Sequence, residues 1–293
     1  MDCGSILHQA IIFTAYLRHN CDMDLTIQKL IPYLVVVFIY LAVAIDYWRA
    51  IKNPEHKQLT LHSVMIALGL LIHGWLLHQG IFSHGFNLGF YQSISAIFWL
   101  TVLIYWITDR QHALHSLQAF VLPPAAFFAL LPAFTVNDHY LPVAQNGLYM
   151  AHIWIAMIAY SLFTFAALHA ILMAVAERSL HHKATLIELP NFPPLMLMES
   201  LLFKIISSGF VLLTVTLASG MWFSEEIFHK PLQFNHKTIF SMVSWLIYAA
   251  LLFGRYRYGW RGLKAIRWTL AGFFLLILAY IGTQFVLQIL LKH

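Results

Sequence analysis

Histidine is the residue type whose number and placement most suggest chemistry, since 17 histidines stand in a chain with only 10% charged residues. A neutral imidazole binds a soft divalent metal, or the iron of a haem, through one ring nitrogen. Most of these histidines lie in polar stretches, where a solvated surface role is the simpler interpretation. A polar side chain within a long apolar run instead needs a partner or a function. Of the histidines that lie within or beside such runs, four are candidates: His73, His78, His152 and His236.

His152 and His236 form the leading pair of candidate ligands. His152 lies near the start of the apolar run 146–175, and His236 comes just before the run that begins at Thr238. Two imidazoles that reach the same membrane level from different helices suit a haem iron or a soft divalent metal. Nearby acidic residues match no compact zinc motif. The alternative is that His152 bonds a neighbouring helix and that His236 caps its own helix or is solvated.

His73 is a further candidate, because it lies near the middle of the apolar run 62–82. The alternative role for this imidazole is a hydrogen bond between two helices. His78 lies in the same run, closer to its end and on a neighbouring face.

The stretch that joins the sixth and seventh apolar runs has features that a haem requires. Lys230 and Lys237 can form charge-assisted hydrogen bonds with haem propionates. Aromatic residues also gather at membrane interfaces for reasons unrelated to a ligand. Those that can cover an apolar macrocycle here are Trp222, Phe223, Phe228 and Phe234.

The elements that must position these residues are membrane helices. The chain is 60% hydrophobic with a mean hydropathy of +0.73, whereas a soluble domain has about 45–50% apolar residues and about 25% charge. A membrane span requires about 20 mostly apolar residues. The runs that meet this requirement are 30–48, 62–82, 88–108, 114–134, 146–175, 202–223, 238–254 and 266–290. We therefore expect an all-α polytopic bundle of about eight transmembrane helices.

Two local features modify this scheme. Pro123 and Pro124 predict a kink or a break in the fourth span, because proline cannot donate the helical hydrogen bond. The stretch 195–203 predicts a short interfacial helix that leads into the sixth span.

Lysine and arginine predict the orientation, because loops rich in these residues stay on the cytoplasmic side. Cation-rich loops follow the first, third, fifth and seventh spans, while 83–87 and 136–146 contain neither residue. Both termini and the loop 224–237 should therefore be external. We expect an external segment at 1–29 and a single transmembrane domain at 30–293. No cleavable signal peptide is evident in residues 1–22, and Met23 begins a more ordinary membrane-protein N-terminus.

The stretches Ser208–Trp222 and Ser244–Gly262 are two apolar runs on either side of the loop 224–237. They resemble the helices that precede and follow the tryptophan-rich loop of one known family, the cytochrome c assembly proteins (CcsA/CcmC-like, haem-handling membrane proteins). His152 with 155–163 resembles the family's first external histidine helix, and Gly272–Gly282 resembles its last helix. The similar core covers about 148–290.

The resemblance implies that two external histidines and the tryptophan-rich loop hold haem at the outer surface. His152 carries over as the first histidine, and His293 is the only histidine near the position of the second. Trp222 remains from the loop, and Lys237 is in register with a lysine of its motif. The Trp-Trp-Asp core of that loop is absent, so the chain resembles a divergent branch. His73 is a counterpart of an intramembrane histidine.

We therefore expect a haem-binding protein of a bacterial inner membrane that is accessory to cytochrome c biogenesis, with His152 and His236 on the haem iron. No residue is assigned a catalytic role. Expected partners are membrane lipid and other cytochrome c maturation components or an apocytochrome, and not nucleic acid. Two alternatives stay open: a regulatory or scaffolding membrane protein linked to haem synthesis or metal homeostasis, and a transporter of haem or a divalent metal.

Overall fold

Among the described residues of the computed structural model, eight helices are long and apolar enough to cross a membrane, which confirms the predicted number and the all-α class. The structure describes residues 28–49, 59–83, 86, 88–112, 114–134, 147–181, 194–226 and 236–285. The first helix is Gln28–Arg49. The others are α2 (Leu59–Phe82), α3 (Phe90–His112), α4 (Gln118–Leu130), α5 (Gly147–His181), α6 (Leu195–Glu226), α7 (His236–Tyr258) and α8 (Gly262–Phe285). The protein is a polytopic membrane protein.

These runs form helices because lipid offers no hydrogen-bond partner to the backbone, and a helix satisfies its peptide groups within one segment. The fourth span is helical even though it contains two prolines. Helix α4 continues through Pro123 and Pro124, so the predicted break is wrong. The short 3-10 turns η2 (His115–Leu117) and η3 (Leu131–Phe134) extend α4 at its two ends.

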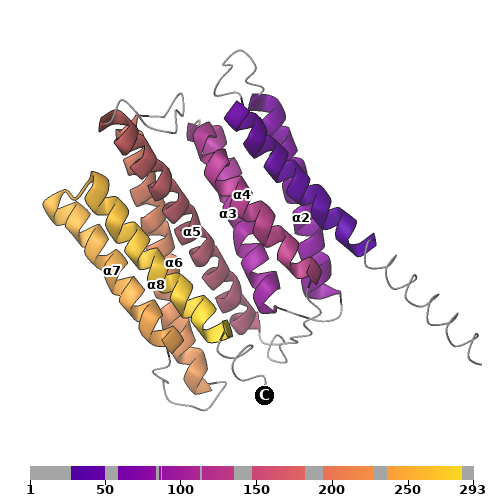
Figure 1. Cartoon of the computed structure of the whole chain (residues 1–293). Helices are drawn as coiled ribbons and strands as arrows, with labels where there is room; N and C mark the ends of the chain where they lie inside the picture. Colours follow the sequence, from indigo (N-terminus) through magenta and orange to yellow (C-terminus); the bar gives the residue numbers. More distant parts are fainter. Residues whose placement is uncertain are drawn as a thin grey trace, which may run out of the picture.

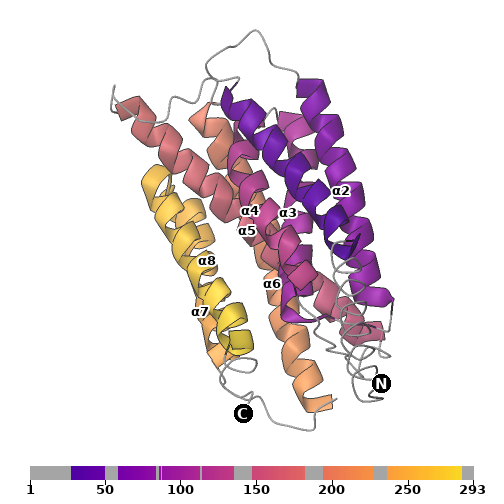
Figure 2. The ribbon, with the colours of Figure 1, turned by 45° about the vertical axis from the view of Figure 1, so that its right-hand side comes forward.

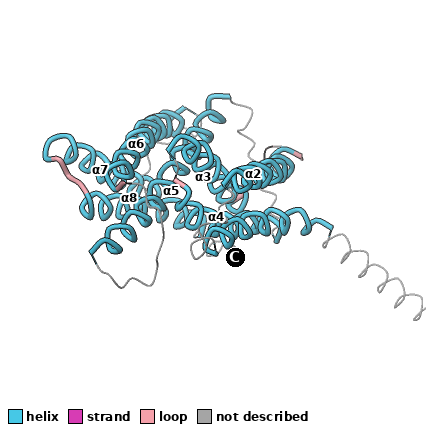
Figure 3. The backbone as a smooth tube through the Cα atoms, turned by 90° about the horizontal axis from the view of Figure 1, so that it is seen from above, coloured by secondary structure: helices cyan, strands magenta, loops and turns pink. Residues whose placement is uncertain are grey.

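Helix α5 lies at the centre of the bundle. It packs against α3, α6 and α8, while α7 pairs with α8 and α2 pairs with α3 (Figures 1 and 3). Its 35 residues correspond to about 52 Å of helix, at about 1.5 Å per residue. The hydrocarbon core is only about 30 Å thick, and Figure 2 shows α5 crossing the bundle at a slant. A residue on α5 can therefore contact several other helices.

The bundle has two chemically different ends, because successive helices run in opposite directions. We call the end where α5 begins and α6 ends the histidine end; it carries His152, Phe223 and His236. The opposite end, the arginine end, carries Arg49, Arg110, Arg178 and Arg255, among others. This segregation is what the loop charges predict.

An ion-pair cluster holds three helices together at the arginine end. Glu199 of α6 binds Arg255 of α7, and the Nε atom of Arg261 lies 3.6 Å from the same carboxylate. The backbone N–H of Gly262 donates to the second oxygen of Glu199 over 3.4 Å. Gly259 and Gly262 have φ angles of 66° and 53°, which glycine adopts without strain and which make the tight turn into α8 possible.

Helix α6 differs from its prediction at its start. The stretch 195–203 is not a separate interfacial helix but the first two turns of α6, which runs without interruption to Glu226. Met198, Leu201 and Leu202 are buried there. The pattern looked interfacial in the sequence because only the bundle supplies the apolar neighbours that cover these side chains.

Candidate functional site

His152 lies in the second turn of α5 and faces α6. Its Nδ1 atom is 2.7 Å from the hydroxyl oxygen of Ser219. The same hydroxyl is 2.7 Å from the backbone carbonyl of Val215, to which it donates as serine commonly does within a helix. Both contacts are hydrogen bonds only if the imidazole Nδ1 carries a hydrogen and donates it to Ser219.

This arrangement determines which ring nitrogen is available. A neutral imidazole with its hydrogen on Nδ1 has its lone pair on Nε2. Ligating histidines usually have their other nitrogen hydrogen-bonded in this way, which orients the ring and raises its basicity. In this tautomer, Nε2 is the ring nitrogen of His152 that could act as a ligand.

Aromatic rings surround the imidazole. Tyr149 stacks with His152 at 6.2 Å between ring centroids and an interplanar angle of 21°. Phe223 packs edge-on against both, at 5.7 Å from His152 and 5.9 Å from Tyr149. Phe223 is 8% exposed, so the His152 imidazole packs against aromatic surface where α5 contacts α6 at this end.

The start of α7 lies at the same end of the bundle. Lys237 and the preceding His236 are exposed there. Trp222 is 68% exposed beside the buried Phe223. The structure therefore brings His152, Ser219 and Phe223 into contact, and it places Lys237, His236 and Trp222 at the same end of the bundle. A shared iron between His152 and His236 stays a prediction.

His73 belongs to a different part of the bundle. It is 1% exposed, with Nε2 3.0 Å from the Ser95 hydroxyl of α3 and Nδ1 3.5 Å from the Tyr40 hydroxyl of the first helix. Both ring nitrogens thus have interhelical partners. This geometry favours the structural alternative for His73.

The remaining predicted features lie outside the described residues. These are His293 and the loop residues Phe228, Lys230 and Phe234. Within the described parts of the chain, no three His, Cys, Asp or Glu side chains gather in a way that could hold a metal ion. Haem does not require such a group, since the porphyrin supplies four of the iron's ligands.

Ser219 is the site residue that the sequence did not single out. Its only sequence signal is a small polar residue in an apolar helix, which Ser207 and Thr214 share. Trp154 is close to His152 in the sequence but lies apart from it in the structure. It follows His152 by two residues, but it faces α2 and α3, where it lines a separate pocket. Residues two apart on a helix point about 200° apart, so Trp154 is not part of the wall around His152.

Comparison with known proteins places the chain in a family. The model of the cytochrome C assembly protein family matches residues 61–291, and the chain belongs to this family. It is 32% identical over 174 residues to the inner membrane protein YpjD of Escherichia coli K12, in a match that covers 58% of this chain and 65% of that relative. It is 22% identical over 284 residues to a cytochrome c biogenesis protein CcsA of Prochlorococcus marinus, covering 86% of this chain and 89% of that relative.

Proposed function

We propose that this protein handles haem at the histidine end of the bundle, with that end facing outward from a bacterial inner membrane, as an accessory to cytochrome c biogenesis. The observation that carries the proposal is the hydrogen bond from His152 to Ser219, which directs Nε2 away as a ligand nitrogen. The family, and the CcsA relative named for cytochrome c biogenesis, support the same conclusion.

The described residues fit haem as a substrate. His152 would supply an imidazole to the haem iron. The porphyrin face is broad and apolar, and Tyr149 and Phe223 present aromatic surface next to that imidazole. The propionates are anionic, and Lys237 is a cation at the wet end of α7. His236 is our proposed second ligand, since it is exposed one residue from Lys237.

The chain's role with haem is to bind, orient and partly cover it. The absence of the Trp-Trp-Asp core distinguishes this branch, and we infer that transient holding rather than delivery is its task. The regulatory and transport alternatives gain no support from the described contacts or from the relatives.

The test is the absorption spectrum of the purified full chain. We expect a Soret band after growth with haem or after haem is added. His152→Ala should remove most of that band, His236→Ala should change it from six-coordinate to five-coordinate character, and added imidazole should partly restore each. His112→Gln, at the arginine end, is the matched control and should bind like the wild type. A folded wild type without a Soret band, or two unchanged mutant spectra, would refute the proposal.

A further inference from the structure

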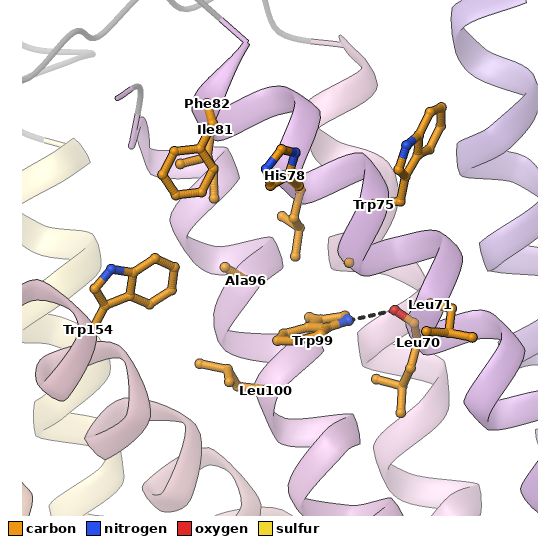
Figure 4. A pocket seen from close by; sticks show the side chains of 12 residues that line it. Leu70, Leu71, Trp75, His78, Ile81, Phe82, Ala96, Trp99, Leu100 and Trp154 are labelled. Atoms are coloured by element: carbon orange, nitrogen blue, oxygen red, sulfur yellow. Dashed lines mark hydrogen bonds between the residues drawn. The ribbon is translucent and has the colours of Figure 1, made fainter. Parts of the chain in front are cut away.

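A pocket lies between α2, α3 and α5, on the opposite face of α5 from His152. It has a volume of about 390 Å³, within the range of about 300–1,000 Å³ typical of small-molecule sites. Figure 4 shows three indoles around it, from Trp75, Trp99 and Trp154, with the His78 imidazole and the Phe82 ring near its upper edge. We call this pocket the tryptophan groove.

The floor of the groove is rigid. The Nε1–H of Trp99 donates to the Leu70 carbonyl over 2.8 Å, a bond drawn in Figure 4. Gly74 allows this approach, because a Cβ atom there would lie 3.1 Å from the Trp99 ring. The indole is therefore held flat against α2 by both a hydrogen bond and close packing, as in a preformed binding site.

The mouth of the groove opens toward lipid. Trp75 is 54% exposed and Leu71 is 73% exposed, although both lie in the apolar span Thr60–Phe82. A side chain that is exposed at this depth faces the acyl chains of the bilayer. A ligand of the groove would thus arrive from the membrane rather than from water.

The lining of the groove is almost entirely apolar. Among the described residues, the lining contains no Lys, Arg, Asp or Glu, and its only titratable side chain is that of His78. That ring packs 5.3 Å from Phe82 at the end of α2. It lies four residues before the end of α2, or about 6 Å along the helix axis, so the imidazole is close to the end of the span.

We propose that the tryptophan groove binds an isoprenoid quinone, with the His78 imidazole donating a hydrogen bond to a ring carbonyl. A quinone ring is flat and uncharged, so it can stack on the indoles while its tail leaves through the lipid-facing mouth. Haem fits less well, because its two carboxylates would meet no cation in the lining. An acyl chain gains nothing from an ordered indole floor or an imidazole.

The test uses the full chain in quinone-free phosphatidylcholine nanodiscs, titrated with decylubiquinone while tryptophan fluorescence is recorded. We expect saturable quenching. His78→Leu should raise the Kd about fivefold, since one neutral hydrogen bond is lost, and Ala96→Leu should abolish binding by filling the groove. Trp245→Phe is the matched control, because that indole bonds Thr214 elsewhere, and it should keep the wild-type Kd. His152→Ala should also keep it, which separates this site from the proposed haem site.

A second measurement uses only the wild type, so it does not depend on whether a variant folds. A photoreactive azidoquinone on the wild type should label peptides of α2, of α3 near Trp99, or of α5 near Trp154. Labelling elsewhere, non-saturable quenching, or equal Kd values for wild type, His78→Leu and Ala96→Leu would overturn the proposal. Displacement by haem would make haem the occupant instead, and displacement by 1-decanol at equal concentration would reduce the groove to an acyl-chain cleft.

Discussion

Ser219 is the residue through which the fold acts on His152. Its hydroxyl accepts from Nδ1 and donates to Val215, so the hydrogen on the imidazole is placed by a residue 67 positions away in the chain. In metal sites, loss of such a supporting bond typically lowers affinity about 10–100-fold. Ser219 is thus a positioning residue of the proposed haem site.

Ser219→Ala should weaken haem binding about tenfold and raise the reduction potential of the bound iron, because an imidazole without this acceptor donates less electron density. Haem titration and a spectroelectrochemical potential measure the two effects. Ser207→Ala is the control: its hydroxyl makes the same bond within α6, to Phe203 at 2.7 Å, but touches no histidine. Equal behaviour of the two variants would show that Ser219 does not position the ligand.

His73→Leu should affect the stability of the protein rather than haem binding. It removes the hydrogen bonds to Ser95 and Tyr40 and leaves two hydroxyls in an apolar interior, at a cost of about 1–3 kcal/mol. We expect a lower melting temperature in detergent and an unchanged Soret band. A normal melting temperature with a lost Soret band would return His73 to the list of ligands.

At the scale of elements, the glutamate cluster joins α6, α7 and the start of α8. Glu199 is only 13% exposed at its side chain, and Arg255 is 27% exposed. Arg255 also donates to the Trp260 carbonyl over 3.2 Å and lies 4.6 Å from the Phe203 ring centroid. In the sequence, Arg255 is one of the cations that follow the seventh span. The structure adds a specific acidic partner for it, Glu199.

Arg255→Gln should therefore destabilise the protein by about 1–3 kcal/mol, since it leaves a largely buried carboxylate with a weaker partner. Thermal unfolding in detergent measures this. Arg257→Gln is the matched control, because Arg257 is exposed and lies 5.9 Å from the Tyr258 ring centroid, and it should change little. Both variants should keep any haem spectrum, because the cluster lies across the membrane from His152. A spectrum lost in either folded variant would contradict this placement of the site.

At the scale of the whole molecule, α5 lies between the two proposed sites. One face carries His152 against α6, and the opposite face carries Trp154 against α2 and α3 (Figure 4). The orientation of both sites then follows from the charge difference between the two ends of the bundle. We predict that the histidine end is external.

Single cysteines test this orientation in cells. With Cys3 and Cys21 replaced by serine, Ser224→Cys should react with an impermeant thiol reagent from outside, and Tyr256→Cys should react only after permeabilisation. Tyr256 suits the purpose because it is 91% exposed, whereas Gly262 has a positive φ of 53° at which cysteine would be strained. External labelling of both positions would make the predicted orientation wrong.

The sequence by itself determined the class of the protein, the number of spans and the segregation of arginines, and it indicated His152 as a candidate. These properties are local, because a run of apolar residues forms a membrane helix whatever its neighbours are. Motif similarity added the family, which the family model confirms over residues 61–291.

Only the tertiary structure decided which side chains meet. The pairing of His152 with Ser219, the separation of Trp154 from that site, and the bond between Glu199 and Arg255 join residues on different helices or opposite faces. A helix that faces lipid on one side and protein on the other is apolar on both, so its sequence has little periodicity to reveal the packed face. The contacts depend on how each helix is rotated in the bundle, and that rotation is set by packing between helices.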